Sequence, residues 1–357
     1  MDERSAAAYE YDLPSALIAQ EPAPQRDRAR LAVVGRDGTI EDHVFADLPG
    51  VLRRGDLLVL NETRVLPHRL RARRTSGGSA EVLLLHPAAG LAYDEGARSW
   101  IALVRPSKRL HDGERLDLCA HGGEPVATLE MVTDFGQGRR EVRIDSALPL
   151  RELLARCGRL ALPPYIHNES PQAQERYQTV FARIPASVAA PTAALHFTQT
   201  LLQSLTEQGI GIAKLALDIG AGTFVPMHAE RIDDHAMHAE RYTLPVQTVE
   251  AIEAARRDKR RVVAVGTTVV RALEGNAAAN GRLRAGEFET SLFITPGFAF
   301  SVVDALVTNF HLPRSTLLVL VSAFAGREQI LAAYREAVAR GYRFYSFGDA
   351  MLLQRTV

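Results

Sequence analysis

The stretch LALDIGAGTFVPMHAERIDDHAMHAE, from Leu215 to Glu240, decides how this chain of 357 residues is organised. Apolar side chains alternate with others from Leu215 to Ile219, which is the period of a half-buried strand. The segment 220–223, Gly-Ala-Gly-Thr, then permits a tight turn and a close approach to a ligand, because glycine carries no side chain. Titratable residues crowd the rest of the stretch: His228, Glu230, Asp233, Asp234, His235, His238 and Glu240. The pattern predicts a strand that ends in a ligand-binding turn, followed by an acid–base cluster.

Each part of this stretch also has a plainer interpretation. A Gly-x-Gly after a strand lacks the third glycine of a dinucleotide fingerprint and the lysine of a phosphate loop, so an ordinary β-turn fits equally well. His235 and His238 would share one face of a helix and could hold a metal there, but the chain has no HExxH motif and no set of cysteines. The solvated start of a helix is a further alternative. We favour a substrate-binding or acid–base cluster.

Composition favours a globular protein, and the length suggests two domains. Apolar residues make up 46% of the chain, and Lys plus Arg equal Asp plus Glu at 42 each, so only local patches would attract a polyanion. Cys119 and Cys157 are too few for a disulfide framework or a cysteine zinc site, which suits a reducing compartment. The N-terminus has no apolar region typical of a signal peptide. The longest apolar run, residues 317–325, is far shorter than the roughly 20 residues that cross a bilayer. We therefore expect a soluble cytoplasmic protein with no membrane segment.

Residues 67–148 predict a small β domain. Short candidate strands follow one another at 68–73, 80–86, 100–104, 114–118, 127–132 and 140–144, separated by glycine-rich turns. Strands of this length and spacing are typical of a β-barrel or sandwich. Before them, residues 55–60 read as a buried strand that ends at Asn61-Glu62-Thr63-Arg64. This polar cluster is either a ligand site at a sheet edge or an ordinary strand-end turn.

The predicted β domain is rich in arginine. Arg71, Arg73 and Arg74 lie in its first strand, and further basic residues follow at 105–109 and 139–143. One basic face could contact phosphates, although surface arginines usually only keep a strand soluble. We select the first three as candidate phosphate contacts.

The remainder of the chain predicts an α/β arrangement. Helical patterns occupy 172–180, 199–208, 246–259, 269–274, 329–340 and the apolar segment that ends at Gly326. Strands are expected at 261–265 and 291–294, and a strand or loop at 342–353. Ser315 is placed to cap the apolar helix.

Three segments of this part bring polar groups to the starts of helices. Small residues at 187–194 precede His196 and would let a ligand approach closely. Thr267 and Thr268 stand at a helix start, where free amides form an anion site, although simple N-capping explains the threonines as well. Asn309 and His311 lie directly before the buried apolar helix.

With these pieces aligned, the chain resembles the S-adenosylmethionine:tRNA ribosyltransferase-isomerase family of queuosine biosynthesis. The resemblance covers nearly the whole chain. It rests on the motifs at 11–14, 17–20, 61–65, 162–166, 175–178, 187–198, 220–240, 266–274, 308–326 and 343–351.

The resemblance implies an enzyme that moves the ribosyl part of S-adenosylmethionine onto 7-aminomethyl-7-deazaguanine at the tRNA wobble position. The sugar is isomerised to an epoxycyclopentane, and adenine and methionine are released. The family's fold implies a larger α/β domain, residues 1–66 and 149–357, with a small antiparallel β-barrel domain, residues 67–148, inserted into it. We expect S-adenosylmethionine as co-substrate, tRNA as partner, no metal and a monomer.

Several positions depart from the family pattern. Ala186 and Ala194 replace glycines, Val269 replaces a serine, Asp218 replaces a histidine, and Glu62 replaces an aspartate. Asp218 changes local charge and hydrogen bonding, or it binds the cationic aminomethyl group of the substrate. These departures suggest, as an alternative, a catalytically weakened tRNA-binding relative. A metal-dependent hydrolase built on His235, His238 and nearby carboxylates is a further alternative.

The candidate site residues follow from both lines of reasoning. For catalysis we expect a histidine base, because histidine titrates near neutral pH. The catalytic candidates are His238, which we favour, His311 and Glu240. The substrate-binding candidates are His196, Asp218, Gly220, Gly222, Thr223, Phe224, His235, Thr267, Thr268, Arg271 and Asn309.

Overall fold

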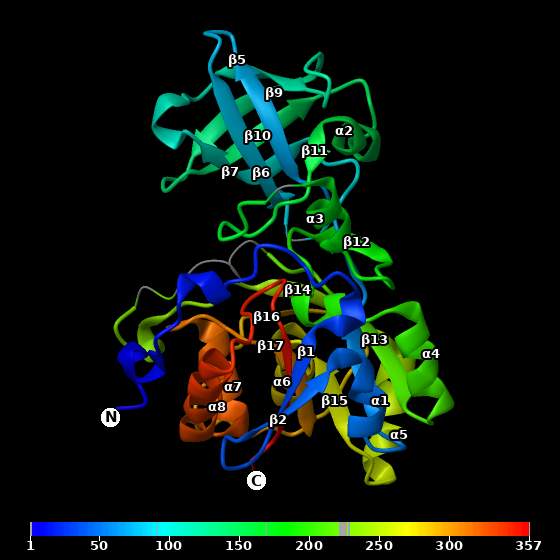
Figure 1. Ribbon diagram of the computed structural model, residues 1–357. Coiled ribbons are helices and arrows are strands. Elements are labelled where there is room, and N and C mark those ends of the chain that lie inside the picture. Colours follow the sequence, from blue (N-terminus) through cyan, green and yellow to red (C-terminus); the bar gives the residue numbers. More distant parts are fainter. Residues whose placement is uncertain (1, 91, 169, 221–226, 228, 357) are drawn as a thin grey trace.

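The computed structural model describes residues 2–356 except 91, 169, 221–226 and 228. It has two lobes, a β-barrel above and a helix-covered sheet below (Figure 1). Both the first and the last described residues belong to the lower lobe, and the chain leaves that lobe once to build the barrel.

The lower lobe is built on one sheet that has nine strands in the described part of the chain, in the order β16-β14-β13-β3-β15-β17-β18-β1-β2. The pairs β13–β3, β3–β15, β15–β17 and β18–β1 are parallel, and the other neighbours are antiparallel. The bounds are β1 Arg30–Val34, β2 Ile40–Val44, β3 Leu57–Asn61, β13 Gly211–Leu217, β14 Glu240–Leu244, β15 Val262–Val265, β16 Gly286–Thr290, β17 Ala305–Asn309 and β18 Ala350–Gln354.

Helices cover both faces of this sheet, which explains why its central strands are apolar without a break. In β3, Leu57 and Val59 join one core and Leu58 and Leu60 join the other, as the period of two requires. The first core contains α5 Val246–Arg257, α6 Thr267–Asn280, α7 Thr316–Ala325 and α8 Arg327–Ala339, and the second contains α1 Leu48–Val51 and α4 Gln199–Glu207. The predicted α/β sandwich is confirmed.

The upper lobe is the predicted antiparallel barrel. Its strands are β5 Arg69–Arg74, β6 Ser79–Pro87, β7 Ser99–Arg105, β8 Arg115–Cys119, β9 Pro125–Asp134 and β10 Arg139–Asp145. They run in the order β5-β6-β7-β10-β9-β8, and pairing of β5 with β8 closes the ring. Apolar side chains from alternate positions of every strand fill the interior of the closed barrel.

The lobes are joined where β3 continues into the barrel. β4 Thr63–Val65 pairs with β12 Ile184–Ser187, and α3 Pro171–Arg176 lies beside them. β3 and β13, which flank the barrel in sequence, pair in parallel, so one sheet is continuous across it. α2 Leu150–Cys157 packs into the barrel core and β11 Gly158–Arg159 pairs with β5. We propose the division at 1–66, 67–148 and 149–357 with α2 and β11 attached to the barrel.

Short 3-10 helices make up much of the rest. They are η1 Ala6–Tyr9, η2 Ser15–Leu17, η3 Arg26–Arg28, η4 Phe45–Asp47, η5 Ser107–Arg109, η6 Thr192–His196 and η8 Ile232–Asp234. Among the described residues no single helix is long and apolar enough to cross a membrane; only α7 and α8 together, bent by 115°, reach that length and composition.

Two local predictions are wrong. Residues 291–294 form no strand, because the edge strand β16 already ends at Thr290, whose hydroxyl accepts the N–H of Leu292. The predicted helix at 269–274 begins earlier, at Thr267, and continues to Asn280. Ser315 does cap α7, accepting the N–H of Leu318 at 3.2 Å.

A buried histidine in the barrel predicts how stability depends on pH. His68 is 1% exposed, stacks near Tyr93, meets Trp100 edge to face, and has no hydrogen-bond partner on either ring nitrogen within the described structure. Burial lowers its pKa to about 4. As pH falls below about 6.5 the unfolded chain takes up the proton first, so stability is lost between about pH 6.5 and 4.

We therefore expect His68→Phe to keep the packing and to remove this acid sensitivity. The free energy of unfolding of the variant minus that of the parent should be larger at pH 5 than at pH 8 by on the order of 2 kcal/mol. Urea unfolding at both pH values measures this. An equal difference between the two proteins at pH 8 and pH 5 would contradict the assignment.

Candidate active site

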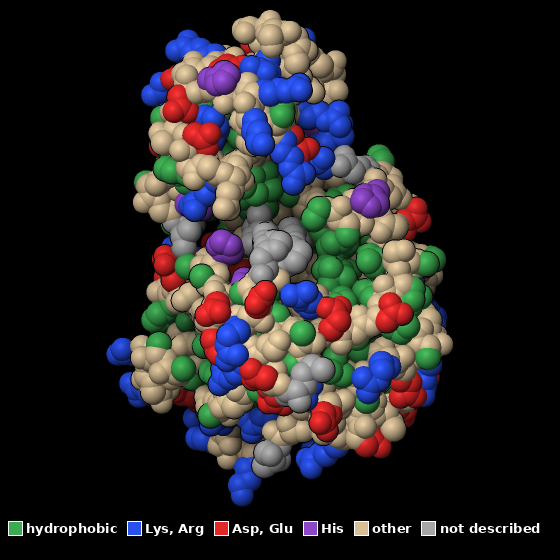
Figure 2. Space-filling view, turned by 90° about the vertical axis from the view of Figure 1, so that its left-hand side faces the viewer, with side chains coloured by type: hydrophobic (Ala, Val, Ile, Leu, Met, Phe, Trp, Pro, Cys, Tyr) green, Lys and Arg blue, Asp and Glu red, His purple; other side chains and the backbone are tan. Residues whose placement is uncertain are grey.

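A pocket opens in the lower lobe beneath the barrel, at the carboxyl ends of the parallel strands β15 and β17. It is lined by residues 190–193, 266–268, 308–313, 315–317 and 345–346, with Tyr165 and Ile219. About 870 Å³ of space lies between these residues, part of it open to solvent. Figure 2 shows the waist of the molecule hollowed and lined with apolar side chains, with Lys and Arg side chains on the adjoining part of the barrel. Open α/β sheets bind ligands at this edge.

The amino end of α6 forms one wall of the pocket. Gly266 precedes the helix with φ 94°, a conformation that side chains rarely adopt. Neither Thr267 nor Thr268 caps the helix with its side chain, so the capping interpretation is wrong. Within the described residues the backbone N–H groups of both threonines also have no hydrogen-bond partner. Their free amides therefore point positive partial charge at the pocket, as the sequence suggested.

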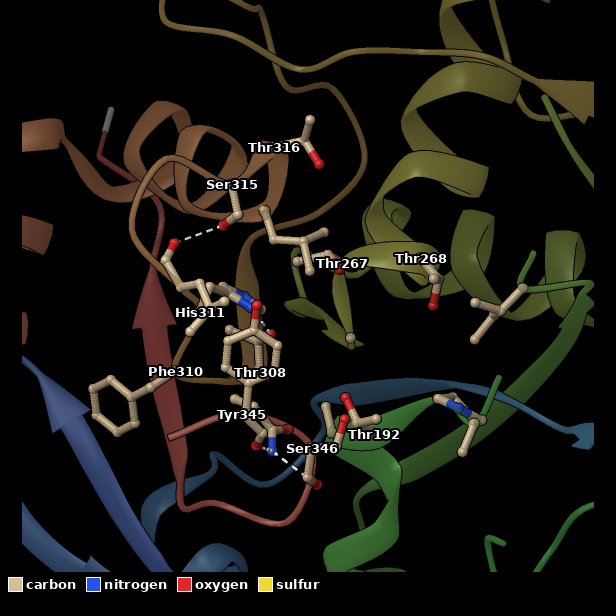
Figure 3. A pocket seen from close by; sticks show the side chains of 18 of the residues that line it. Thr192, Thr267, Thr268, Thr308, Phe310, His311, Ser315, Thr316, Tyr345 and Ser346 are labelled. Atoms are coloured by element: carbon tan, nitrogen blue, oxygen red, sulfur yellow. Dashed lines mark hydrogen bonds between the residues drawn. The ribbon is translucent and has the colours of Figure 1, made fainter. Parts of the chain in front are cut away.

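His311 forms the opposite wall, just after β17, and its side chain is 8% exposed (Figure 3). Burial lowers its pKa to about 3, so the imidazole is neutral at physiological pH. Its Nε2 lies 3.2 Å from Thr308 Oγ1. Its backbone N–H donates to the Tyr334 hydroxyl at 3.0 Å, and its carbonyl accepts from the Tyr11 hydroxyl at 2.5 Å. The first contact orients the ring, and the other two hold the backbone that carries it.

The floor of the pocket contains aromatic residues that the sequence analysis missed. Tyr165 and Tyr345 meet with ring centroids 3.9 Å apart, and the Tyr165 hydroxyl bonds the Ser346 hydroxyl. Asn309, predicted to bind substrate, lines the pocket but uses its amide N–H to hold the carbonyl of Tyr345 at 2.8 Å. The only sequence signal for these tyrosines was their place in the motifs at 162–166 and 343–351.

His196 lies beside the pocket without lining it. It is 5% exposed, its ring centroid is 5.0 Å from that of Phe45, and Nε2 has no partner among the described residues. Burial lowers its pKa to about 4. It lines a second, smaller cavity with Arg26 and Arg176, and Ser346 contributes to both cavities. The small residues at 190–193 line the first pocket, whereas His196 packs beside Phe45.

A second group of charges gathers where β13 and β14 meet α6. Glu240 is 6% exposed and forms a buried ion pair with Arg271, which also donates to Leu292 O at 2.9 Å. Burial raises the pKa of Glu240, and the Arg271 guanidinium opposes this. Burial also raises the pKa of Asp218 to about 7. The positive charge of Arg241 opposes this rise, and the negative charge of Glu240 adds to it. None of these side chains lines the pocket.

The other titratable residues of the opening stretch separate in space. His238 is exposed, and His235 packs its ring 5.6 Å from that of Phe293. Residues 235–239 are irregular, so the predicted helix start at this point is wrong. Asp233 pairs with Arg4 at 2.8 Å on the surface. Within the described residues, which leave out His228, no three His, Cys, Asp or Glu side chains come together as metal ligands.

The glycine turn is described only in part. Gly220 follows β13 in an irregular conformation and does not line the pocket, whereas its neighbour Ile219 does. Gly222, Thr223 and Phe224 lie outside the described residues.

The cluster at 61–64 is structural. Asn61 is fully buried, and Glu62, 3% exposed, pairs with Arg183 at 2.6 Å. None of these residues lines the pocket, so the strand-end interpretation holds.

The three barrel arginines differ in their surroundings. Arg71 is exposed and has no ion pair within the described part of the chain. Arg73 is exposed and lies 3.6 Å from Asp117, whereas Arg74 is half-buried and pairs with Glu114 at 2.6 Å. Arg71 and Arg73 are therefore available to an external anion, whereas the guanidinium of Arg74 is already paired within the barrel.

Comparison with known proteins identifies close relatives over almost the whole chain. The family model described as queuosine biosynthesis protein matches residues 6–353. The S-adenosylmethionine:tRNA ribosyltransferase-isomerase of Rubrobacter xylanophilus is 51% identical over 96% of this chain and 96% of its own. That of Moorella thermoacetica is 51% identical over 97% of this chain and 98% of its own. The crystal structure of the S-adenosylmethionine tRNA ribosyltransferase from Thermotoga maritima is 36% identical, covers 97% of this chain and 99% of its own, and has a TM-score of 0.53.

The buried pair of Glu240 and Arg271 yields a stability prediction. Glu240→Ala leaves a guanidinium buried without its counter-charge, so we expect a loss on the order of 3 kcal/mol in the free energy of unfolding. The double variant Glu240→Leu/Arg271→Leu should recover much of this loss, because neither charge remains. Urea unfolding measures both.

The matched control is Glu287→Ala on β16. Glu287 pairs with Arg241 but its side chain is 63% exposed, so its loss should cost less than about 1 kcal/mol. Equal effects of Glu240→Ala and Glu287→Ala would show that the buried pair does not stabilise the fold.

Proposed function

Because the chain belongs to the S-adenosylmethionine:tRNA ribosyltransferase-isomerase family of queuosine biosynthesis, we propose that the pocket beneath the barrel is where this reaction takes place. The ribosyl part of S-adenosylmethionine is moved onto 7-aminomethyl-7-deazaguanine at the tRNA wobble position and isomerised to the epoxycyclopentane. One observation carries the assignment of the site: a fixed neutral histidine and a free helix amino end face each other across this pocket.

The chemistry requires a base. The sulfonium of S-adenosylmethionine acidifies the 5′ carbon of its ribose, so a base first removes a proton there. Adenine then leaves, the aminomethyl nitrogen attacks the sugar, and methionine departs as the ring closes. The proton taken at the start is available for return to a leaving group, as general acid–base catalysis requires.

We assign the base to His311 in preference to His238. If Nε2–H of His311 donates to Thr308 Oγ1, the lone pair of Nδ1 is free, and this contact is the one hydrogen bond of the ring within the described residues. The depressed pKa keeps the ring neutral, so it accepts a proton without first losing one. The low pKa also makes the imidazole a weaker base. The positive sulfonium offsets this weakness, because it stabilises the negative charge that develops when the proton is removed. His238 is exposed and does not line the pocket.

Two further groups suit the charges of the substrates. The free amides of Thr267 and Thr268 would hold the carboxylate of the donor or a phosphate of the tRNA. Asp218, whose pKa of about 7 follows from burial, would become fully ionised beside a cationic aminomethyl group.

The departures from the family pattern give little support to a weakened relative. Ala194 and Val269 are fully buried in the two cores and do not line the pocket. Asp218 does not line the pocket either, but it lies near the charged side chains Arg241, Glu240 and Glu287. A metal-dependent hydrolase also gains no support, since the described histidines His235 and His238 do not share a ligand cluster.

The tRNA would approach from the barrel side of the waist. Its wobble base must leave the anticodon-loop stack to enter the pocket, as in other enzymes that act on bases. With no net charge on the protein, phosphate contacts must come from local arginines such as Arg71 and Arg73. We further propose that the enzyme works as a monomer in the cytoplasm, where its tRNA substrate is made.

Replacement of each histidine by alanine tests which of the two is the base. His311→Ala should lower kcat by about 100-fold or more, because general base catalysis contributes this much. His238→Ala should stay within a few-fold of the parent. Release of adenine with precursor-bearing tRNA measures turnover, and separate binding of S-adenosylmethionine and tRNA shows that the variants still bind. Near-normal turnover of His311→Ala, or its loss in His238→Ala, would reverse the assignment.

Charge reversal tests the tRNA surface. Arg71→Glu/Arg73→Glu should weaken tRNA binding about tenfold or more and lower the salt dependence of affinity by about two counterions. The control, Arg256→Glu/Arg257→Glu, changes charge equally on exposed residues of α5, at the end of the lower lobe away from the barrel (Figure 1). Filter binding between low and moderate salt measures both. Equal loss in the two variants would indicate a general charge effect and exclude the barrel patch.

A further inference from the structure

Tyr345 has a backbone conformation that aromatic residues rarely adopt. In the described part of the chain, positive φ occurs at the non-glycine residues Gln137, Lys259, Arg314 and Tyr345. Only Tyr345, with φ 74°, carries an aromatic ring and lines the pocket. A bulky side chain in this region costs free energy, and such residues cluster at ligand-binding sites.

The surrounding structure holds this conformation at several points. The N–H of Tyr345 donates to Phe310 O at 3.0 Å, and its carbonyl accepts from Asn309 Nδ2 at 2.8 Å and from the N–H of Gly348 at 2.9 Å. A Cβ on Gly348 would lie 2.5 Å from Arg343 O, so the turn closes only around glycine. The turn is therefore built to place this ring, and Asn309 is a positioning residue that acts through it.

The ring of Tyr345 is half-buried and reaches the pocket among Thr308, His311 and Ser346 (Figure 3). The ring of Tyr165 meets it in an edge-to-face contact at 64°. Its hydroxyl has no hydrogen-bond partner within the described residues, in contrast to that of Tyr165. Burial raises the pKa of this hydroxyl, so it remains a neutral donor and acceptor.

These features suit a flat heteroaromatic ligand. The ring is held against Tyr165 in an edge-to-face contact, a polar group stands at the ring edge, and the small residues at 190–193 line the same pocket. Stacking on tyrosine binds any purine-like base through its π-face, and an edge hydroxyl adds a hydrogen bond.

We propose that Tyr345 is the stacking face for a purine-type base during the reaction. The inference rests on the proposed function, because both substrates carry such a base: adenine in S-adenosylmethionine and 7-deazaguanine in the tRNA. The shared chemistry is a planar fused ring, and separate binding measurements distinguish the two sources.

The test compares Tyr345→Leu and Tyr345→Phe. Both replacements carry a Cβ, so the backbone strain is unchanged, and only leucine removes the aromatic face. Calorimetry without tRNA gives the affinity for S-adenosylmethionine, and adenine release at saturating S-adenosylmethionine gives KM for precursor-bearing tRNA. The control is Phe135→Leu, which removes an aromatic ring, 54% exposed, from the barrel. It should leave the affinity for S-adenosylmethionine unchanged.

We expect Tyr345→Leu to weaken binding of one substrate about tenfold or more, and Tyr345→Phe to weaken it much less. A change in the affinity for S-adenosylmethionine alone assigns the ring to adenine, and a change in KM for tRNA alone assigns it to the deazaguanine. Unchanged binding of both substrates, or equal losses in the leucine and phenylalanine variants, overturns the proposal. Adenine release by the parent enzyme tests the proposed function separately.

A second variant reports on stacking even if the leucine variant is unstable. Tyr345→Trp retains an aromatic face, and the protein's single native tryptophan, Trp100, is fully buried in the barrel. A stacked purine should quench the new indole when S-adenosylmethionine or precursor-bearing tRNA is added, with guanine-bearing tRNA as control. Binding of both substrates without any change in fluorescence overturns the proposal.

Discussion

The side-chain amide of Asn61 is the contact on which both lobes and the pocket depend. Its Nδ2 donates to Leu217 O at 3.0 Å, and its Oδ1 accepts the N–H groups of Leu217 at 3.0 Å and Thr63 at 3.1 Å. The amide thus extends the pairing of β3 with β13 past the point where β3 turns toward the barrel. Because Asn61 is fully buried, loss of its amide would leave these backbone groups unsatisfied in the interior.

The hydroxyl of Ser187 connects this hydrogen-bond network to the pocket. Ser187 Oγ accepts the N–H of Ile219 at 2.8 Å and meets Thr63 Oγ1 at 2.7 Å. Ile219 is a wall of the pocket, so the same polar network that starts the barrel also places the end of β13. The barrel and the pocket are therefore coupled through backbone positions and not through a flexible linker.

Within the lower lobe, the buried charged side chains lie apart from the neutral groups of the pocket. The pocket presents a neutral His311, free amides and aromatic rings, whereas the ionised pair Glu240 and Arg271 is buried away from it. Among the described residues that line the pocket there is no full charge, so dipoles meet the developing charges there, and they act strongly where water is excluded. The exposed arginines on the barrel can then contact phosphates without disturbing the chemistry.

The sequence by itself determined the architecture, because its signals are local. Alternation in strands such as 68–73 and 140–144, the unbroken apolar run of 57–60 and the cap at Ser315 all depend on neighbouring residues. It also placed Thr267 and Thr268 near the start of a helix, two residues before the expected bound, and His311 before the apolar helix, but it did not predict the strand β17 that precedes His311. It could not rank His311 above His238, because crowding along the chain says nothing about which side chains converge in space. Only the tertiary structure showed that Glu240 is neutralised by Arg271, that Asn61 continues a sheet, and that Tyr345 is held at positive φ by Asn309. Each of these contacts joins residues that are distant in sequence, so burial and pairing, which only the fold brings about, decided their roles.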